Sequence, residues 1–309
     1  MVPCHMLLEW ELDFKHMKNF NIDKIRVSKG KNFDISKHDT AYHGEYDQDG
    51  AEDRLKKLTK KLSKEQQKFC ASDNHSLLII FQAMDAAGKD GTIRRVMSGI
   101  NPQGCAVSSF KAPSKLELDH DFLWRTTKAL PERGQIGIFN RSYYEEVLVC
   151  KVHPEYVLGQ NIPHIDSLEK IDKDFWKDRY ESINDFEKHI TRNGTKVLKF
   201  FLNLSKEEQK NRFLSRIHEP DKNWKFSYGD IKERRNWDKY QEVYQEMIQN
   251  TSTEKCPWYV IPADNKWFMR TCVSEIISET LDSMSHEYPV LPKKEMDLLD
   301  QAKNELLNE

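Results

Sequence analysis

Residues 76–92, which read SLLIIFQAMDAAGKDGT, constrain the fold more than any other stretch of the chain. They begin with the apolar run Leu77–Phe81, which has the length of a strand buried on both faces. A loop of small residues over 83–88 follows, then Lys89 and a helical stretch over 93–100. The N–H groups at a helix N-terminus and a lysine ammonium both attract phosphate. The stretch therefore predicts a strand, a phosphate-binding P-loop and a helix.

This loop departs from the common pattern GxxxxGK[ST] at two positions. Ala83 stands in place of the first glycine, and Asp90 in place of the hydroxyl that binds magnesium. Asp85 adds a second carboxylate, and carboxylates beside phosphates are favourable only where metal ions lie between them. An ordinary turn with a surface lysine remains the alternative. Besides Lys89 and Asp90, the loop residues expected to contact phosphate are Ala86, Ala87, Gly88, Gly91 and Thr92.

Composition argues against several classes of protein. The 309 residues carry a net charge of −2, so no overall positive field points to nucleic acid. No apolar run reaches transmembrane length and residues 1–12 lack a signal-peptide pattern, so we expect no membrane association. The six scattered cysteines show no metal-type spacing and indicate reduced thiols in a cytoplasmic protein.

Apolar runs alternate with helical patterns, which predicts an α/β fold with a parallel sheet and helices on both faces. We expect an extended N-terminal arm over 1–50, then one domain over 51–309 with an insertion at about 205–250. The expected strands are 76–83, 105–110, 136–139, 197–204 and 258–261. The expected helices, besides 93–100, are 52–71, 116–130, 143–150, 168–192, 205–217, 266–284 and 295–307.

The strand at 136–139 ends in a second polar group, Asn140-Arg141-Ser142. Ligands of open parallel sheets bind beyond the carboxyl ends of the strands, so this group should lie opposite the P-loop. The guanidinium of Arg141 fits a two-pronged clamp on phosphate. A salt bridge from Arg141 to Glu145 or Glu146 is the alternative.

The insertion is rich in cations. Arg212 and Arg216 are four residues apart and so share one face of a helix. The segment over 223–235 adds Lys225 and a glycine. A cation-rich segment of this kind can close over phosphates and exclude water, as a lid does. A solvated helical hairpin is the alternative, although it explains the paired arginines less well.

A further group of cations could line a channel for an extended polyanion. Lys111 and Lys115 follow the strand at 105–110, and Arg94 follows the P-loop. Each alone is more often a solvated surface residue. Their position near a P-loop raises the weight of the channel interpretation.

Four segments together resemble the family-2 polyphosphate kinases: AMDAAGKDGT, NPQGCAVSSFKAPSKLELDHDFLWR, GQIGIFNRSYYEEVLV and NWKFSYGDIKER. The resemblance implies a three-layer α/β/α P-loop kinase fold with a parallel central sheet and a helical lid. It implies reversible phosphoryl transfer between polyphosphate and nucleotides with Mg²⁺, Mn²⁺ being a second candidate, in a homo-oligomer. It also implies Lys89 on phosphates, Arg141 in the second motif, and Arg212 and Arg216 on the lid. Asp85 is implied as a carboxylate at the metal or on the acceptor side.

One departure from the family pattern bears on the acceptor. Many members have Asp where this chain has Asn140, and Glu145 could replace the lost carboxylate at the metal. The form Asn-Arg-Ser-x-Tyr-Glu resembles the class III subgroup, which accepts both AMP and ADP. Two alternatives stay open: an ATP-dependent nucleoside monophosphate kinase of the thymidylate kinase type, and a non-catalytic phosphate-binding module.

Overall fold

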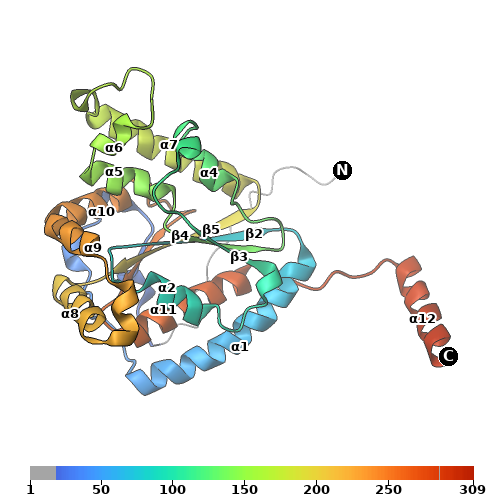
Figure 1. Cartoon of the computed structure of the whole chain (residues 1–309). Helices are drawn as coiled ribbons and strands as arrows, with labels where there is room; N and C mark the ends of the chain where they lie inside the picture. The colour runs from blue at the N-terminus through green and yellow to red at the C-terminus, as the bar shows by residue number, and fades with distance from the viewer. Residues whose placement is uncertain (1–18, 285) are drawn as a thin grey trace.

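The computed structural model describes residues 19–284 and 286–309, and its centre is a six-stranded sheet (Figure 1). The strand order is β1-β6-β5-β2-β4-β3, with β2 between β5 and β4. Every pair is parallel except β1 with β6. The strands are β1 (Arg26–Val27), β2 (Ser76–Ala83), β3 (Cys105–Ser109), β4 (Ile136–Asn140), β5 (Thr195–Asn203) and β6 (Trp258–Pro262). The five predicted strands are confirmed.

Helices cover both faces of the sheet, which confirms the three-layer α/β/α architecture (Figure 1). Successive side chains of a strand point to opposite faces, and β2 accordingly sends Leu77 and Ile79 into one core and Leu78 and Ile80 into the other. The first core is closed by α1 (Gln48–Ser72), α2 (Lys89–Val96) and α11 (Lys266–Ser283). The second is closed by α7 (Lys173–Arg192) and α10 (Trp237–Thr251).

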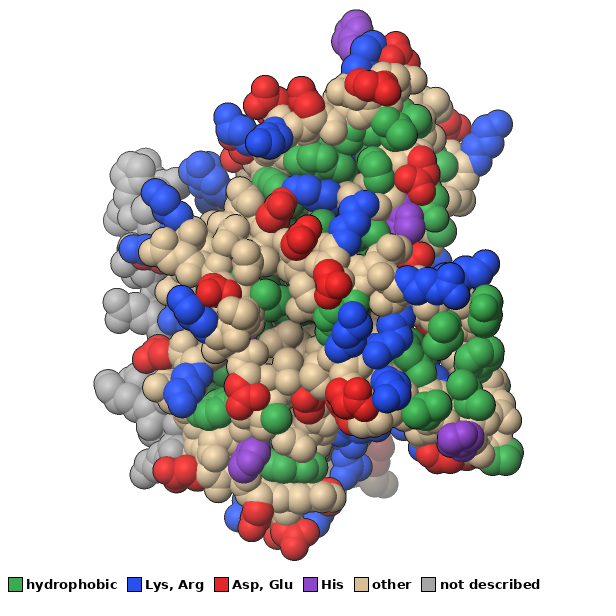
Figure 2. Space-filling view, turned by 90° about the vertical axis from the view of Figure 1, so that its left-hand side faces the viewer, with side chains coloured by type: hydrophobic (Ala, Val, Ile, Leu, Met, Phe, Trp, Pro, Cys, Tyr) green, Lys and Arg blue, Asp and Glu red, His purple; other side chains and the backbone are tan. Residues whose placement is uncertain are grey.

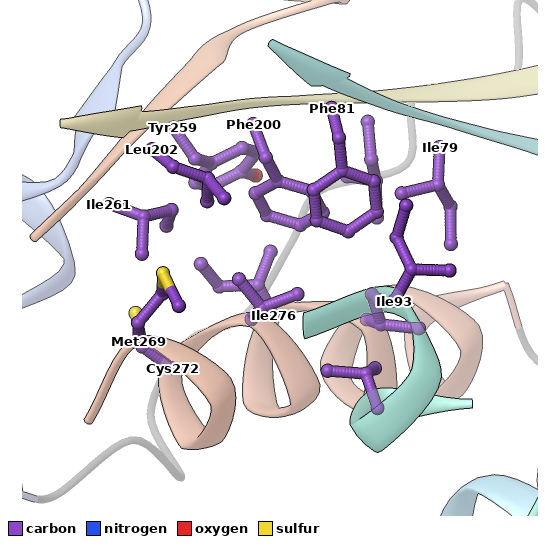
Figure 3. Packing of buried hydrophobic residues seen from close by; sticks show 14 of the residues in the cluster. Ile79, Phe81, Ile93, Phe200, Leu202, Tyr259, Ile261, Met269, Cys272 and Ile276 are labelled. Carbon is purple, nitrogen blue, oxygen red and sulfur yellow. The ribbon is translucent and has the colours of Figure 1, made fainter. Parts of the chain in front are cut away.

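The first core is dense and aromatic on its sheet side (Figure 3). The rings of Phe81 and Phe200 lie 5.3 Å apart between centroids. Helix α11 points Met269 and Ile276 at the sheet and is buried on nearly every side, because α1 packs against its outer face. This burial fixes the direction of α11, whose first turns lie beside the P-loop.

Short elements complete the fold. The predicted helix at 116–130 is two helices, because the Asp121 carboxylate accepts a hydrogen bond from the Leu123 N–H and begins a new turn. The predicted helix at 143–150 starts as a 3-10 helix.

The remaining elements are α3 (Lys115–Leu118), α4 (Trp124–Thr127), α5 (Val149–Val152), α6 (Glu155–Leu158), α8 (Lys206–His218), α9 (Tyr228–Glu233), α12 (Lys293–Leu307), η2 (Ile22–Lys24), η3 (Gly30–Asn32), η4 (Ile35–Lys37), η5 (Pro102–Gly104), η6 (Tyr143–Val147), η7 (Leu168–Lys170), η8 (Pro220–Lys225) and η9 (Arg234–Asn236).

The predicted N-terminal arm lies partly outside the described residues, and its described part is not a separate arm. Phe20, Ile25 and Tyr46 are buried in the first core. Strand β1 adds an antiparallel edge to the sheet. Helix α1 then begins at Gln48, after Asp47 accepts a hydrogen bond from the Gly50 N–H. The boundary predicted near residue 50 therefore does not separate two bodies.

The predicted lid insertion at 205–250 is too long at its C-terminal end. Tyr240, Tyr244 and Ile248 lie four residues apart on α10 and are buried in the second core. Spacing of this kind gives one apolar helix face. The candidate lid is therefore limited to residues 206–236, which form α8, η8, α9 and η9. Among the described residues, no helix is long and apolar enough to cross a membrane.

A buried ion pair fixes the chain that follows β4. Lys199 of β5 is fully buried and its Nζ lies 2.7 Å from Glu187 Oε2 of α7. The same Nζ donates to the Tyr144 hydroxyl and to the Thr251 carbonyl, at 3.0 and 2.8 Å. The hydroxyls of Tyr143 and Tyr144 in turn donate to Glu187. The tyrosines of η6 are thus held by a network in which every charge has a partner.

Glu187→Leu should destabilise the fold by about 3–5 kcal/mol, because it leaves the Lys199 ammonium buried without a counter-charge. The double change Glu187→Leu with Lys199→Met removes both charges and should cost clearly less than the single change. Urea unfolding followed by tryptophan fluorescence measures both. A double variant that is less stable than the single one would contradict this account of the network.

Candidate active site

The P-loop between β2 and α2 is a strained turn. Gly88 caps α2 with a φ of 101°, which suits glycine. Ala86 has a φ of 63°, which is uncommon for a residue with a side chain. Ala83, in place of the first glycine of the motif, is not among the positive-φ residues and ends β2 normally. The substitution at 83 is therefore tolerated because the sharp turn occurs later in the loop.

The carbonyl groups of this loop are bound from the side of α8. Gln209 Nε2 donates to the Asp85 carbonyl at 2.9 Å, and Arg212 Nη1 donates to those of Ala86 and Ala87 at 3.2 and 2.7 Å. In a planar trans peptide the N–H points opposite to the carbonyl. The N–H groups that follow Asp85 and Ala87 in the chain therefore point away from α8, as in anion-binding backbone nests.

The position of Arg212 differs from the expectation that this arginine belongs to a lid that closes over phosphates. Its side chain is only 6% exposed, and Nη2 donates to the carbonyls of Ala263 and Asp264, at 2.5 and 3.1 Å. Its Nε lies 2.8 Å from Glu208. With the contacts to the P-loop, one guanidinium joins the loop after β2 to the loop after β6. In this conformation Arg212 shapes the phosphate site rather than facing it.

Lys89 is folded back on the loop. Its Nζ donates to the Ala83 carbonyl at 2.8 Å. Burial and the repulsion of Arg141 lower the pKa of the Lys89 ammonium, against the attraction of Asp85 and Glu145. A phosphate in the loop would offer this ammonium a charged partner in place of a neutral carbonyl. Lys89 therefore has a neutral partner that an anion can replace, and its contact with phosphate stays a prediction.

Arg141 lies beside the P-loop at the end of β4. Its φ is 65°, and its N–H donates to the Phe81 carbonyl at 3.1 Å, which ties the turn to β2. Its Nη2 lies 3.3 Å from Asp85 Oδ1. The salt-bridge alternative to Glu145 or Glu146 thus does not describe the observed pair. Burial opposes the charge, but the carboxylates of Glu145 and Asp85 raise the pKa of Arg141.

Two further polar groups stand beside Arg141. With the Gln82 amide oriented so that its nitrogen faces Glu145, that nitrogen lies 2.8 Å from Glu145 Oε1. Burial raises the pKa of Glu145, against the attraction of Arg141 and Lys89. Asn140 Nδ2 donates to Asp90 Oδ1 at 2.6 Å. The two departures from the common motifs, Asn140 and Asp90, are therefore in direct contact.

The lid contributes a carboxylate that the sequence analysis missed. Arg216 Nη1 lies 3.1 Å from Asp230 Oδ2, which links α8 to α9. Burial and the neighbouring charge of Asp85 raise the pKa of Asp230. Asp230 follows the lid glycine in the segment NWKFSYGDIKER, and that position was the available signal. The lid therefore brings an arginine and an aspartate to the P-loop side.

Arginines of α2 and α11 form a second missed feature. Arg270 lies near the P-loop, with Nη2 3.7 Å from where a side chain on Gly91 would begin. Burial, then the charges of Arg95 and Arg94, lower the pKa of Arg270. Its Nε is buried without a hydrogen-bond partner. The crowding of Arg94 and Arg95 around Arg270 suits a polyanion. On the face with α8, α9 and α10, Figure 2 shows further Lys and Arg side chains at the right, with Asp and Glu side chains among them.

Not every predicted residue reaches the loop. Thr92 is buried, its N–H donates to the Gly88 carbonyl and its hydroxyl faces the Met269 sulfur, so the expected phosphate contact of Thr92 is not supported. Lys111 and Lys115 are exposed, beyond the edge strand β3. Lys225 is exposed on the lid, with Nζ 5.0 Å from the centre of the Trp224 ring.

A cavity of about 740 Å³ lies between the α3–α4 region and the start of α7. Phe122 and Phe175 line it, and the buried Arg179 stacks between them. Asp119, Asp121 and two further aspartates stand around it. Four carboxylates against Lys170 and Arg179 leave the lining of this cavity without an excess of positive charge, so it does not suit a polyanion.

Comparison with known proteins settles the family. Residues 45–289 match the sequence profile of the family described as Polyphosphate kinase 2. The chain belongs to the polyphosphate kinase 2 family. The matched stretch contains the P-loop, Arg141, the lid and the first turns of α11.

Similarity to members of the polyphosphate kinase 2 family extends over nearly the whole chain. A protein of Rhodopseudomonas palustris named ADP-polyphosphate phosphotransferase is 50% identical over 286 residues, which are 92% of this chain and 98% of that protein. A protein of Meiothermus ruber named AMP/ADP-polyphosphate phosphotransferase is 42% identical over 270 residues, 86% of this chain and 95% of that protein. The crystal structure of Polyphosphate Kinase 2 from Arthrobacter aurescens TC1 superposes with a TM-score of 0.80 at 35% identity, covering 90% of this chain and 95% of that one.

The donor groups at the site fit a divalent metal that is shared with substrate. The carboxylates of Glu145, Asp85 and Asp230 all act on the charge of Arg141 and so lie around it. Within residues 19–284 and 286–309, no three His, Cys, Asp or Glu side chains are grouped closely enough to hold a metal by themselves. Magnesium in phosphate-transfer sites is held by one or two carboxylates, with phosphate oxygens and waters completing its shell. The residues present match that partial set.

Arg212→Ala should lower the free energy of unfolding by about 2–4 kcal/mol, because it leaves four buried carbonyls without their donor. Arg216→Ala is the matched control, since it removes one ion pair at the lid and should cost about 1 kcal/mol or less. Urea unfolding measures both. Equal losses in the two variants would show that Arg212 does not organise the P-loop.

Proposed function

We propose that this chain transfers phosphoryl groups from inorganic polyphosphate to AMP and ADP, in a reversible reaction. Membership of the polyphosphate kinase 2 family and the names of the two relatives support this activity. The observation that carries the proposal is the P-loop, which has Lys89 and Arg141 beside it and the arginines of α2 and α11 nearby. Nucleotides and reduced thiols are typical of the cytoplasm, where we place the reaction.

Phosphoryl transfer needs positioning and charge neutralisation more than covalent catalysis. The outward N–H groups of the P-loop and the ammonium of Lys89 bind the terminal phosphates of the donor. Arg141 holds the phosphate of the acceptor in line with them, released from Asp85 as the substrate arrives. Arg216 of the candidate lid binds phosphate once phosphate has replaced Asp230 as its partner. We propose Mg²⁺, with Mn²⁺ as a second candidate, beside Asp85 and Glu145, where the metal neutralises charge on the phosphate oxygens.

The donor chain extends beyond the P-loop along the cations of α2 and α11. Arg94 and Arg95 both repel Arg270, so Arg270 gains when a phosphate comes between them. Lys266 adds a further charge near Arg212. A donor as short as ATP would not need this row, which favours polyphosphate over the ATP-dependent nucleoside monophosphate kinase. Lys111, Lys115 and Lys225 remain candidates for more distant phosphates.

Lys89→Ala should lower the rate of AMP phosphorylation with long-chain polyphosphate and Mg²⁺ by about 10²–10³-fold, because the full charge at the transferred group is lost. Circular dichroism checks that the variant is folded. In the wild type, polyphosphate should support turnover far better than ATP as the sole donor. Efficient turnover with ATP alone would overturn the proposed donor, and an unchanged rate in Lys89→Ala would remove this lysine from the mechanism.

Arg270→Gln should raise KM for polyphosphate while changing kcat little, and the effect should grow with the length of the donor chain. The reason is that Arg270 contacts phosphates behind the reacting one. Lys115→Gln is the comparison variant and should have a smaller effect, because this exposed lysine beyond β3 is a candidate only for the more distant phosphates. Initial rates with tripolyphosphate and with long chains separate the two. A larger effect in Lys115→Gln would place the donor chain along the β3 side instead.

Glu145→Gln should impair phosphorylation of AMP more than that of ADP. The neutral Asn140 leaves the metal one carboxylate short, and Glu145 is the nearby carboxylate able to hold the metal deep enough for the shorter nucleotide. Glutamine keeps the shape and the contact with Gln82 but removes the charge. Initial rates with each acceptor at saturating polyphosphate test this. Equal losses with AMP and ADP would mean that Glu145 only supports Arg141.

A further inference from the structure

The candidate lid ends at a junction with the rest of the domain, beside α5 and α10 (Figure 1). Glu233, the last residue of α9, lies against His153, which follows α5, with His153 Nε2 2.9 Å from Glu233 Oε2. The hydroxyl of Tyr240 in α10 donates to the same carboxylate oxygen at 2.8 Å. Burial opposes the charge of Glu233, but the hydrogen bonds from His153 and Tyr240 lower the pKa of this carboxyl. A charged carboxylate of the candidate lid is therefore held by the chain segment that follows β4.

The ring of His153 faces a second carboxylate through its other nitrogen. His153 Nδ1 lies 3.4 Å from Glu155 Oε1 of α6, while Nε2 faces Glu233. An ionised carboxylate only accepts hydrogen bonds, and a neutral imidazole has a single N–H to donate. The imidazolium form has two, one for each carboxylate. The two contacts together therefore suit the charged ring.

The other titratable groups around His153 come from α6 and α10. Tyr156 of α6 has its ring centre 5.4 Å from that of His153. In α10, burial raises the pKa of Tyr240, so that its hydroxyl stays neutral. Lys239 of α10 donates to the carbonyl of the residue before His153. One lysine thus opposes a positive charge on the ring, and two carboxylates favour it.

The residue after Glu233 connects this junction to the P-loop. Arg234 Nη1 donates to Gln209 Oε1 of α8 at 2.6 Å and to the Lys206 carbonyl at 2.8 Å. The nitrogen of the Gln209 amide donates to the Asp85 carbonyl of the P-loop at 2.9 Å. A guanidinium only donates, so Arg234 keeps the oxygen of the Gln209 amide toward itself and the nitrogen toward the loop. The position of the lid end therefore determines how Gln209 meets the P-loop.

We propose that His153 is a positioning residue, whose imidazolium form holds the end of the candidate lid through Glu233. Gln209 then stays on the P-loop. The Arg216–Asp230 ion pair stays in place as well, since Asp230 lies three residues before Glu233 in α9. Loss of the ring proton leaves one nitrogen lone pair against a carboxylate, and the junction weakens. The effect on turnover rests on the proposed function, because His153 touches no substrate in this role.

Ratios of kcat over a range of pH separate the charge of His153 from other ionisations, which cancel in the ratio. His153→Gln keeps a neutral donor toward Glu233 at every pH, and His153→Lys keeps a positive charge up to about pH 9. With long-chain polyphosphate, AMP and Mg²⁺, the ratio of wild type to His153→Gln should fall from about 3 near pH 6 to about 1 near pH 9, the size of one partly exposed ion pair. The ratio of wild type to His153→Lys should fall from about 1 to about one third. A ratio to His153→Gln that stays constant with pH would overturn the proposal.

Two matched variants check the partner and the background. Glu233→Gln keeps an acceptor for Tyr240 but removes the charge of the lid end. In that background, adding His153→Gln should change kcat by less than about 1.5-fold. His189→Gln, at an exposed position of α7, should follow the wild type at every pH. An effect of His153→Gln that is as large without the Glu233 carboxylate as with it would overturn the proposal.

Hydrogen exchange tests the junction without the reaction. In the substrate-free protein at one fixed pH of about 6.5, the amides of residues 228–236 should exchange about 3-fold faster in His153→Gln than in the wild type, and those of β2 should not change. Faster exchange in a protein that does not use polyphosphate would support the junction and reject the proposed function. Equal exchange of residues 228–236 in an active enzyme would overturn the junction and leave the proposed function standing.

Discussion

The hydrogen bonds of one buried guanidinium, that of Arg212, determine the shape of the candidate active site. They bind the carbonyls of Ala86 and Ala87 from one side and those of the loop after β6 from another. Because the carbonyls are held toward α8, neighbouring N–H groups are directed to the opposite side, where we propose that phosphate binds. The site is therefore organised before substrate arrives, which spares the reaction the cost of ordering it.

Each cation around this loop has a partner that a bound substrate can replace. Lys89 rests on a carbonyl, Arg141 on Asp85, and Arg216 on Asp230. Phosphate oxygens are stronger partners for these cations than a neutral carbonyl, and a divalent metal can take over the released carboxylates. Since Arg216 and Asp230 both belong to the candidate lid, we propose that this exchange couples phosphate binding to the position of the candidate lid. The closely spaced arginines of α2 and α11 supply further cations whose charge a donor longer than ATP can neutralise.

Much of the fold was predictable because its determinants are local. The strand Ser76–Ala83 and the loop after it are signalled by an apolar run, small residues and a lysine, and all follow one another in the chain. Strand β1 was not predictable, since two residues form no pattern and their pairing with β6 depends on distant chain. Arg212 follows Glu208 by four residues, the usual pattern of a solvated helix face, and nothing local reveals that α8 packs on the P-loop. Arg270 stands in a helix that also carries Lys266, Glu275 and Glu279, so the sequence did not single it out. The apolar spacing of α10 was available in the sequence as a sign that this helix belongs to the core, and the insertion predicted at 205–250 did not take it into account.

The most direct test of the central claim is a crystal structure of this chain with long-chain polyphosphate and AMP. The account predicts phosphate oxygens against the outward N–H groups of the P-loop, the ammonium of Lys89 on phosphate instead of on the Ala83 carbonyl, and Arg212 still bound to Ala86 and Ala87. It also predicts the donor chain running past Arg270. A complex in which Arg212 leaves the loop carbonyls to bind phosphate, while Lys89 stays on Ala83, would contradict the account.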